Sequence, residues 1–201
     1  MFPELTSEAE DLFAQAKEKL VCQSLHRQAD IDSFQLFENG KSTVVIDTYS
    51  FTGKVLDRLE GVHRVFPYVA TCGTGLEDID LSDYDFFAPF WVDILKTKAL
   101  RIGMKQVAEY IRNTYHLTKA NTLNPGSGNV DIWPIEAMSE LFPLIGEVTG
   151  TTGVKLNESC LMIPNKTVAG MFFDKGHDYE SCAYCDRAHC PDRRVPFKES
   201  L

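Results

Sequence analysis

Residues 155–173 read KLNESCLMIPNKTVAGMFF and decide how the chain folds. Apolar and polar residues alternate through 154–162 and again through 167–173, a pattern that is typical of strands with one buried face. Pro164 and Asn165 lie between the two segments, and residues of these types favour a turn. We therefore predict a β-hairpin in this part of the chain.

Helices and strands are also predicted on the N-terminal side of this hairpin. Residues 83–115 carry apolar side chains at helical spacing and predict a long packing helix, which Pro89 either kinks or begins. Ser7 and Glu10 form a capping box, which predicts the start of an amphipathic helix. This N-terminal helix is predicted to extend to residue 24. The other predicted elements are strands over 42–50 and 62–71, a turn at Asn39-Gly40, and helices over 53–60 and 134–145.

Two loops that contain glycines interrupt these elements. Cys72-Gly73-Thr74-Gly75 lacks the third glycine of a dinucleotide fingerprint and the lysine of a P-loop, which favours a tight turn. The second loop, residues 124–128, reads NPGSG and precedes the helix predicted over 134–145. Pro134 suits the first turn of a helix, where free amides can bind a carboxylate or a phosphate. A plain loop is the alternative interpretation.

Half of the six cysteines lie near the end of the sequence. Three of them form a C-x2-C-x4-C-P run in a polar segment, and thiolates at this spacing can converge on one soft metal. The run consists of Cys182, Cys185 and Cys190. The candidates for a fourth ligand are Cys160, which lies on the first predicted hairpin strand, His177 and His189. An iron–sulfur cluster, zinc and metal-free thiols are the three interpretations, and the proline after the run favours the cluster.

The composition of the chain argues against several classes of protein. The 201 residues suffice for one domain with a short appendage, and the formal net charge of −9 argues against a general nucleic-acid binder. Residues 1–16 lack the basic and apolar parts of a signal peptide, and the apolar residues 86–95 are too few to span a membrane. We therefore expect a cytoplasmic protein, in which clustered cysteines indicate metal or redox chemistry before disulfides.

The central part of the chain resembles the activation domain of cobalamin-dependent methionine synthase. The resemblance lies in the loop at 124–126 with the helix after it, in KLNESCLMIP at 155–164 and in VAGMFF at 168–173. Residues 70–77, with the long helix that follows them, resemble stand-alone members of the same family. The match covers about residues 40–173.

This resemblance implies an α+β fold, in which a curved antiparallel sheet packs against helices. We expect an activation-domain-like unit over residues 1–173, and a metal-binding tail over 174–201 that the family lacks. The family domain covers a corrinoid and binds S-adenosylmethionine. By this resemblance the cofactor-binding residues are Asn124, Pro125, Gly126, Ser127, Gly128, Glu158, Ser159 and Pro164.

Two positions depart from the family pattern in the cofactor loop. Thr122 stands where the family carries an arginine four residues before the glycine, and Ser127 stands near the place of a tyrosine. The loss of the arginine removes the obvious partner for a carboxylate, which argues against the family's S-adenosylmethionine site.

One principal hypothesis about function and two alternatives follow. In the principal hypothesis the protein binds cobalamin and carries a [4Fe-4S] cluster that passes electrons to or from the cobalt. The ligands of this cluster would be Cys182, Cys185, Cys190 and Cys160. The partners would be a corrinoid methyltransferase subunit and a reductant protein. The alternatives are a corrinoid-docking module whose tail holds a structural zinc, and a reactivation domain that uses S-adenosylmethionine.

Overall fold

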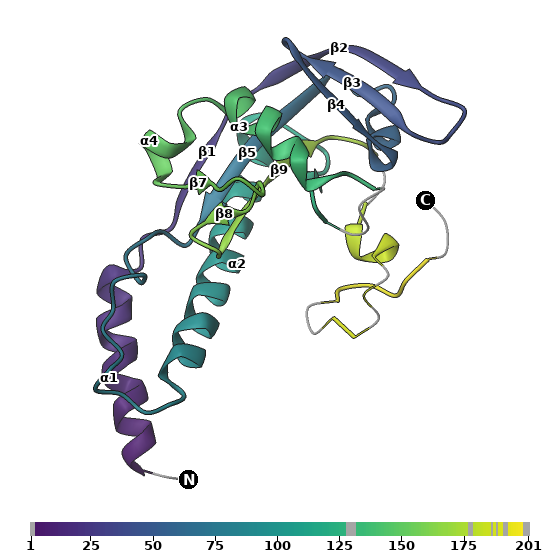
Figure 1. Cartoon of the computed structure of the whole chain (residues 1–201). Coiled ribbons are helices and arrows are strands. Elements are labelled where there is room, and N and C mark those ends of the chain that lie inside the picture. Colours follow the sequence, from purple (N-terminus) through teal and green to yellow (C-terminus); the bar gives the residue numbers. More distant parts are fainter. Residues whose placement is uncertain are drawn as a thin grey trace.

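The computed structural model of the chain (Figure 1) describes residues 3–127, 132–176, 179–185, 187, 189–190 and 193–198. The helices are α1 (Pro3–Lys19), α2 (Ala88–Thr114), α3 (Met138–Ile145) and α4 (Val148–Thr152), and the 3-10 turns are η1 (Lys54–Leu59), η2 (Ile135–Ala137) and η3 (Ser181–Tyr184). The strands are β1 (Gln23–His26), β2 (Ala29–Leu36), β3 (Ser42–Ile46), β4 (Tyr49–Gly53), β5 (Arg64–Thr71), β6 (Asn121–Leu123), β7 (Lys155–Leu156), β8 (Met162–Ile163) and β9 (Thr167–Phe173). In the described part of the chain, no helix combines the length and the apolar character needed to cross a membrane.

Every pairing in the main sheet is antiparallel. Six of its seven strands run in the order β4-β3-β2-β5-β9-β6, and β1 pairs with β5 beside β2. β1 and the start of β2 both lie along β5, after which β2 leaves β5 and pairs with β3. A register shift between Ile31 and Ser33 marks this change of partner, and such irregularities bend a strand. The sheet therefore curls, and the predicted α+β fold with a curved antiparallel sheet is confirmed.

Strand β9 is buried on both faces of the sheet. Ala169, Met171 and Phe173 pack into a core with η1, α3 and the β3–β4 hairpin, whereas Val168 and Phe172 pack toward α2. A strand that is covered on both sides reads as a continuous apolar run, as the sequence VAGMFF does.

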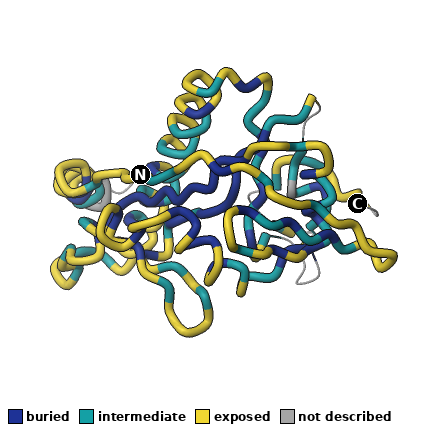
Figure 2. Tube along the Cα trace, turned by 90° about the horizontal axis from the view of Figure 1, so that it is seen from above, coloured by how far each residue is buried: buried dark blue, intermediate teal, exposed yellow. Residues whose placement is uncertain are grey.

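Among the residues that the structure describes, the buried apolar side chains form three clusters. The largest contains Trp133 and lies between the sheet and α3, and a second joins Tyr68 of β5 to Ile111 of α2. The third lies between α1 and α2, where Leu12 and Val92 are buried. Seen from above, the buried residues run through the middle of the molecule (Figure 2).

Helix α1 and the first half of α2 form an arm that projects from the sheet (Figure 1). We define the arm as residues 3–20 and 76–98, which hold eleven acidic and four basic residues and so carry −7 of the net charge of −9. At its base a Cβ on Gly73 would overlap the carbonyl of Val21, so this position requires a glycine. The glycines of the loop at 72–75 therefore allow this loop to pack closely against the end of α1.

Two predicted elements near the N-terminus differ from the structure, and the long helix predicted over 83–115 begins at Ala88, as the second of the two alternatives for Pro89 implies. Helix α1 begins at Pro3 and ends at Lys19, so Ser7 lies inside the helix and does not cap it. The strand predicted over 42–50 is two strands, β3 and β4, because the chain turns at Asp47, whose φ is +52°. Pro89 lies in the first turn of α2 and marks its start.

The predicted hairpin over 154–173 is wrong. Strand β9 pairs with β5 and β6, and β7 pairs with β8 in a separate small sheet. The turn between β7 and β8 is made by Asn157, whose Oδ1 accepts hydrogen bonds from the N–H groups of Ser159 at 3.0 Å and Leu161 at 2.9 Å. Cys160 therefore lies in a turn and not on a strand.

Candidate functional site

A cavity of about 1250 Å³ lies between α2, the β6–β9 part of the sheet, β8 and the residues after β9. In Figure 1, α2 and the yellow tail segment lie on either side below the sheet. Met104 and Ala108 of α2 line one wall, Thr122 and Val168 line the sheet wall, and Tyr179 lines the wall formed by the tail. The volume exceeds the range of about 300–1,000 Å³ that is usual for drug-sized ligands. A larger ligand, or two ligands side by side, would fit.

Asn124 fixes the predicted cofactor loop to the sheet. Its Nδ2 donates hydrogen bonds to the hydroxyl of Tyr68 at 2.8 Å and to the carbonyl of Ala169 at 2.9 Å. The side chain lies over Gly170, where a Cβ would overlap both Nδ2 of Asn124 and the carbonyl of Leu123. The loop therefore needs a glycine at position 170.

The rest of the loop is fixed by backbone contacts. Gly126 has a φ of +72° and donates its N–H to the carbonyl of Trp133 at 2.9 Å. Asn124, Pro125, Gly126 and Ser127 all line the cavity. The structure thus brings four of the predicted cofactor residues together, and their role in binding stays a prediction.

Tyr68 joins the loop to the wall formed by the sheet. Its side chain is buried and its ring lies 4.4 Å from that of Phe172, centroid to centroid. Burial raises the pKa of the Tyr68 hydroxyl well above its usual range. The hydroxyl oxygen accepts the hydrogen bond from Asn124.

Three of the other predicted cofactor residues lie outside the cavity wall. Glu158 and Ser159 are exposed in the β7–β8 turn. Pro164 is buried, and its carbonyl accepts a hydrogen bond from Oγ1 of Thr167 at 2.8 Å. Gly128 lies outside the described residues.

Cys160 makes its contacts within the body of the protein. Its Sγ lies 3.2 Å from Oγ of Ser139 on α3, and its N–H donates to the carbonyl of Asn157 at 3.0 Å. In the residues that the structure describes, no three histidine, cysteine or acidic side chains lie close enough together to hold a metal ion. The predicted site on Cys160 and the three tail cysteines is therefore not assembled among them, and it stays a prediction.

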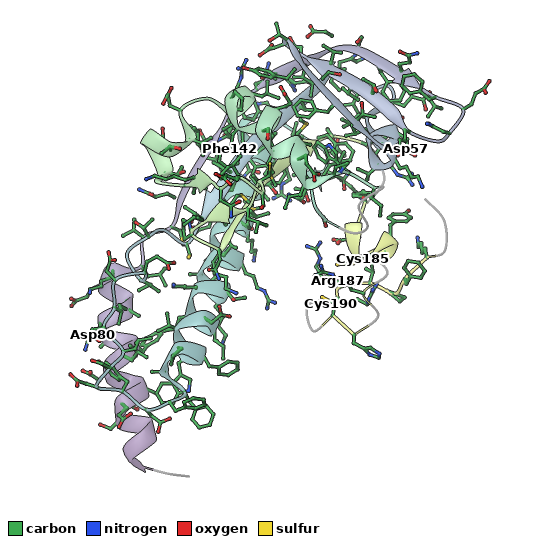
Figure 3. The ribbon with its side chains drawn as sticks, in the orientation of Figure 1. Asp57, Asp80, Phe142, Cys185, Arg187 and Cys190 are labelled. Atoms are coloured by element: carbon green, nitrogen blue, oxygen red, sulfur yellow. The ribbon has the colours of Figure 1, made fainter. Side chains whose placement is uncertain are left out.

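Arg193 holds together the backbone around the tail cysteines. Its Nη1 donates to the carbonyl of Cys182 at 2.7 Å, and its Nη2 donates to the carbonyls of Cys185 at 2.6 Å and Arg187 at 2.9 Å. Its own N–H donates to the carbonyl of Cys190 at 3.2 Å. The labelled residues of this group lie together in the tail (Figure 3). Among the other two candidate ligands, His189 is exposed and His177 lies outside the described residues.

The tail is attached to η1 by an aromatic and cationic contact. Nζ of Lys175 donates to the carbonyls of Arg58 and Glu60 at 3.1 Å each. The rings of Tyr179 and Tyr184 stack with centroids 5.8 Å apart, and the Arg58 guanidinium lies 5.9 Å and 5.6 Å from their centroids. These contacts place Tyr179 in the cavity wall, where burial raises the pKa of its hydroxyl.

Sequence reasoning missed the contribution of α2 to the cavity. The apolar spacing over 83–115 predicts a packing helix throughout, whereas Arg101, Lys105 and Arg112 line the cavity. Their spacing of four and seven residues places them on one face, and this pattern was readable in the sequence. What the pattern does not show is that this face meets a cavity and not bulk solvent.

The curled antiparallel sheet, with helices on its faces and a cavity beneath it, defines the class of protein: an α+β domain with the fold of a methionine synthase reactivation domain. A solved structure of this fold is the crystal structure of the MetH reactivation domain bound to AdoHcy. The likeness has a TM-score of 0.62 at 15% sequence identity, and it covers 89% of this chain and 67% of that chain. At this identity the likeness shows the fold. No protein-family model matches the chain, and no curated protein matches it.

Proposed function

We propose that this chain is a corrinoid reactivation module that binds an S-adenosyl ligand in the cavity. The observation that carries this proposal is the position of residues 124–127. This loop lines the cavity in a fold that is shared with a domain whose crystal structure holds AdoHcy. The comparison favours this alternative over the electron-transfer hypothesis, for which it offers no support.

The residues of the cavity suit an adenosyl ligand. Two hydrogen bonds hold the Asn124 side chain in place before a ligand arrives, and preorganisation lowers the cost of binding. Apolar walls from Met104, Ala108 and Val168 can cover a purine and exclude water. S-adenosylmethionine would supply a methyl cation and leave as S-adenosylhomocysteine. The acceptor would be a corrinoid that a partner presents and that a reductant protein has first reduced by one electron to the cob(I) state.

Replacing Thr122 by arginine is expected to tighten the binding of S-adenosylmethionine about tenfold, because a guanidinium adds a charge-assisted partner for its carboxylate. Thr122 lines the cavity and stands at the family's arginine position. Isothermal titration calorimetry with S-adenosylmethionine and with AdoHcy would measure the change. Thr52→Arg is the matched control, because Thr52 is exposed on β4 at the opposite edge of the sheet. If neither the native chain nor Thr122→Arg gives a saturable heat with either ligand, the proposal is wrong.

A second candidate function is metal binding by the tail. The observation that favours it is the position of Arg193, whose side chain binds the carbonyls of Cys182 and Cys185 and whose backbone N–H binds the carbonyl of Cys190. A chain segment that is already ordered loses less entropy when its thiolates bind a metal. A cluster or a zinc ion would be held by Cys182, Cys185 and Cys190 with a fourth ligand, as the sequence predicts.

We expect anaerobic reconstitution with iron and sulfide to give about four irons per chain and a broad visible absorbance. Cys182→Ser, Cys185→Ser and Cys190→Ser should each remove most of this iron, since three ligands are the minimum for a cubane. Cys22→Ser is the control, because Cys22 lies between α1 and β1, away from the tail. Cys160→Ser tests the fourth ligand. One zinc per chain without colour would favour a structural site, and metal-free protein would show that the tail binds neither.

A further inference from the structure

We propose that the α2 wall of the cavity binds an anionic group of phosphate type. Phosphate does not occur in S-adenosylmethionine or AdoHcy, so this inference adds a second ligand chemistry to the cavity. It does not rest on the proposed function, because it concerns a different wall and a different group.

The cationic residues of α2 lie in one row along the cavity. Arg101, Lys105, Ala108 and Arg112 are separated by four, three and four residues, which places them on one face of a helix. All four line the cavity. In the described part of the chain, no carboxylate lies within ion-pair distance of Lys105 or Arg112. A ligand can therefore meet these two charges without displacing a carboxylate from them.

The other walls of the cavity add to the positive charge. Lys119 lines it beside β6, and Arg194 lines it from the tail. The acidic lining residues are Glu109 and Glu180, and Glu180 forms an ion pair with Arg194 at 3.0 Å. Five cations against two carboxylates give the described lining a formal charge of +3.

The surplus of positive charge in the cavity contrasts with the rest of the molecule. The chain has a net charge of −9, and the arm alone carries −7. Residues taken at random from this chain would give the cavity an acidic lining, so the positive charge of the actual lining calls for an explanation. A concave wall of one charge sign focuses the field and attracts a counter-ion, and a phosphate with its three acceptor oxygens suits neighbouring lysine and arginine side chains.

Two sources could supply this group. One is a free phosphate ester, and the other is the phosphodiester of the nucleotide that a complete corrinoid carries. Cobalamin contains this phosphodiester and cobinamide does not. A comparison of how tightly the two corrinoids bind therefore distinguishes the two sources. Inorganic phosphate serves as the probe for the site itself.

The test compares two double variants with the same loss of charge. Lys105→Gln with Arg112→Gln removes two cations from the row, and Lys17→Gln with Lys98→Gln removes two from the arm, outside the cavity lining. At low ionic strength we expect the native chain to bind inorganic phosphate saturably. The cavity variant should weaken this binding about tenfold or more, and the arm variant less than about twofold.

Corrinoid titrations then identify the source. If cobalamin binds about tenfold more tightly than cobinamide and the cavity variant removes the difference, the phosphodiester of the corrinoid occupies the row. If both corrinoids bind alike while phosphate binding still depends on the row, a free phosphate ester is the ligand. Absence of saturable phosphate binding, or equal weakening in the two double variants, would overturn the inference. Calorimetry with AdoHcy on the same proteins reports separately on the proposed function.

Discussion

Trp133→Ala is expected to lower the free energy of unfolding by about 3–5 kcal/mol, the usual cost of removing a large aromatic side chain from a core. The Trp133 side chain is fully buried, and its ring meets the edge of Phe51 at 6.1 Å between centroids. Gly53 leaves room for the ring, since a Cβ there would lie 3.1 Å from Cδ1 of Trp133. Chemical denaturation followed by circular dichroism at the peptide band measures the loss.

Phe86→Ala is the matched control for this change. Phe86 is an aromatic residue of similar character, but 90% of its surface is exposed. Its replacement should change the free energy of unfolding by less than about 0.5 kcal/mol. Equal effects of the two substitutions would show that the cluster around Trp133 is not the stabilising core.

Gly170→Ala is expected to destabilise the protein by about 3 kcal/mol, because overpacking adds to lost hydrogen bonds. The new Cβ would overlap the Leu123 carbonyl and Nδ2 of Asn124. Asn124 would then lose its hydrogen bonds to Tyr68 and to the carbonyl of Ala169. The cofactor loop would shift with it, so binding of AdoHcy should weaken in the same variant. Denaturation and calorimetry give the two results.

Gly150→Ala provides the comparison for this second change. Gly150 lies in α4, and a Cβ there would meet one carboxylate oxygen of Glu147 at an ordinary 3.8 Å. Alanine favours a helix over glycine by about 0.5–1 kcal/mol, so this variant should be as stable as the native chain or more so. A loss of several kcal/mol here, or none at Gly170, would contradict the packing described for β9.

Most helices and strands could be predicted from the local sequence pattern. The errors concern which strands pair with each other. The apolar run of 62–71 and the helical spacing in α2 each predict an element that the structure contains. The alternation at 154–162 predicts a strand but cannot say what it pairs with, and Asn157 turns the chain instead. Strand β1 was missed because its short stretch, QSLH, has little apolar character and depends on β5 for its pairing.

The candidate site was predictable only where a local motif marks it. The loop at 124–127 has the proline and glycine of a fixed turn, and the structure places it in the cavity. The cationic face of α2 was not predicted, because local pattern does not show that β6, β9 and the tail residue Tyr179 line a cavity together with this face. The role of Arg193 in holding the tail backbone could not be predicted either, because it depends on four carbonyls that come together only in the folded chain.

Because the interior is divided into separate clusters, the fluorescence of two tryptophans can report on two different parts of the molecule. The chain contains two tryptophans. Trp133 belongs to the cluster beneath the sheet, and Trp91 packs against the cluster of the arm. The indole of Trp133 is fully buried and should emit at short wavelength, whereas Trp91 is partly open to water and should emit further to the red. The short-wavelength and long-wavelength parts of the native emission would therefore follow the melting of the sheet and of the arm, without any substitution or added label.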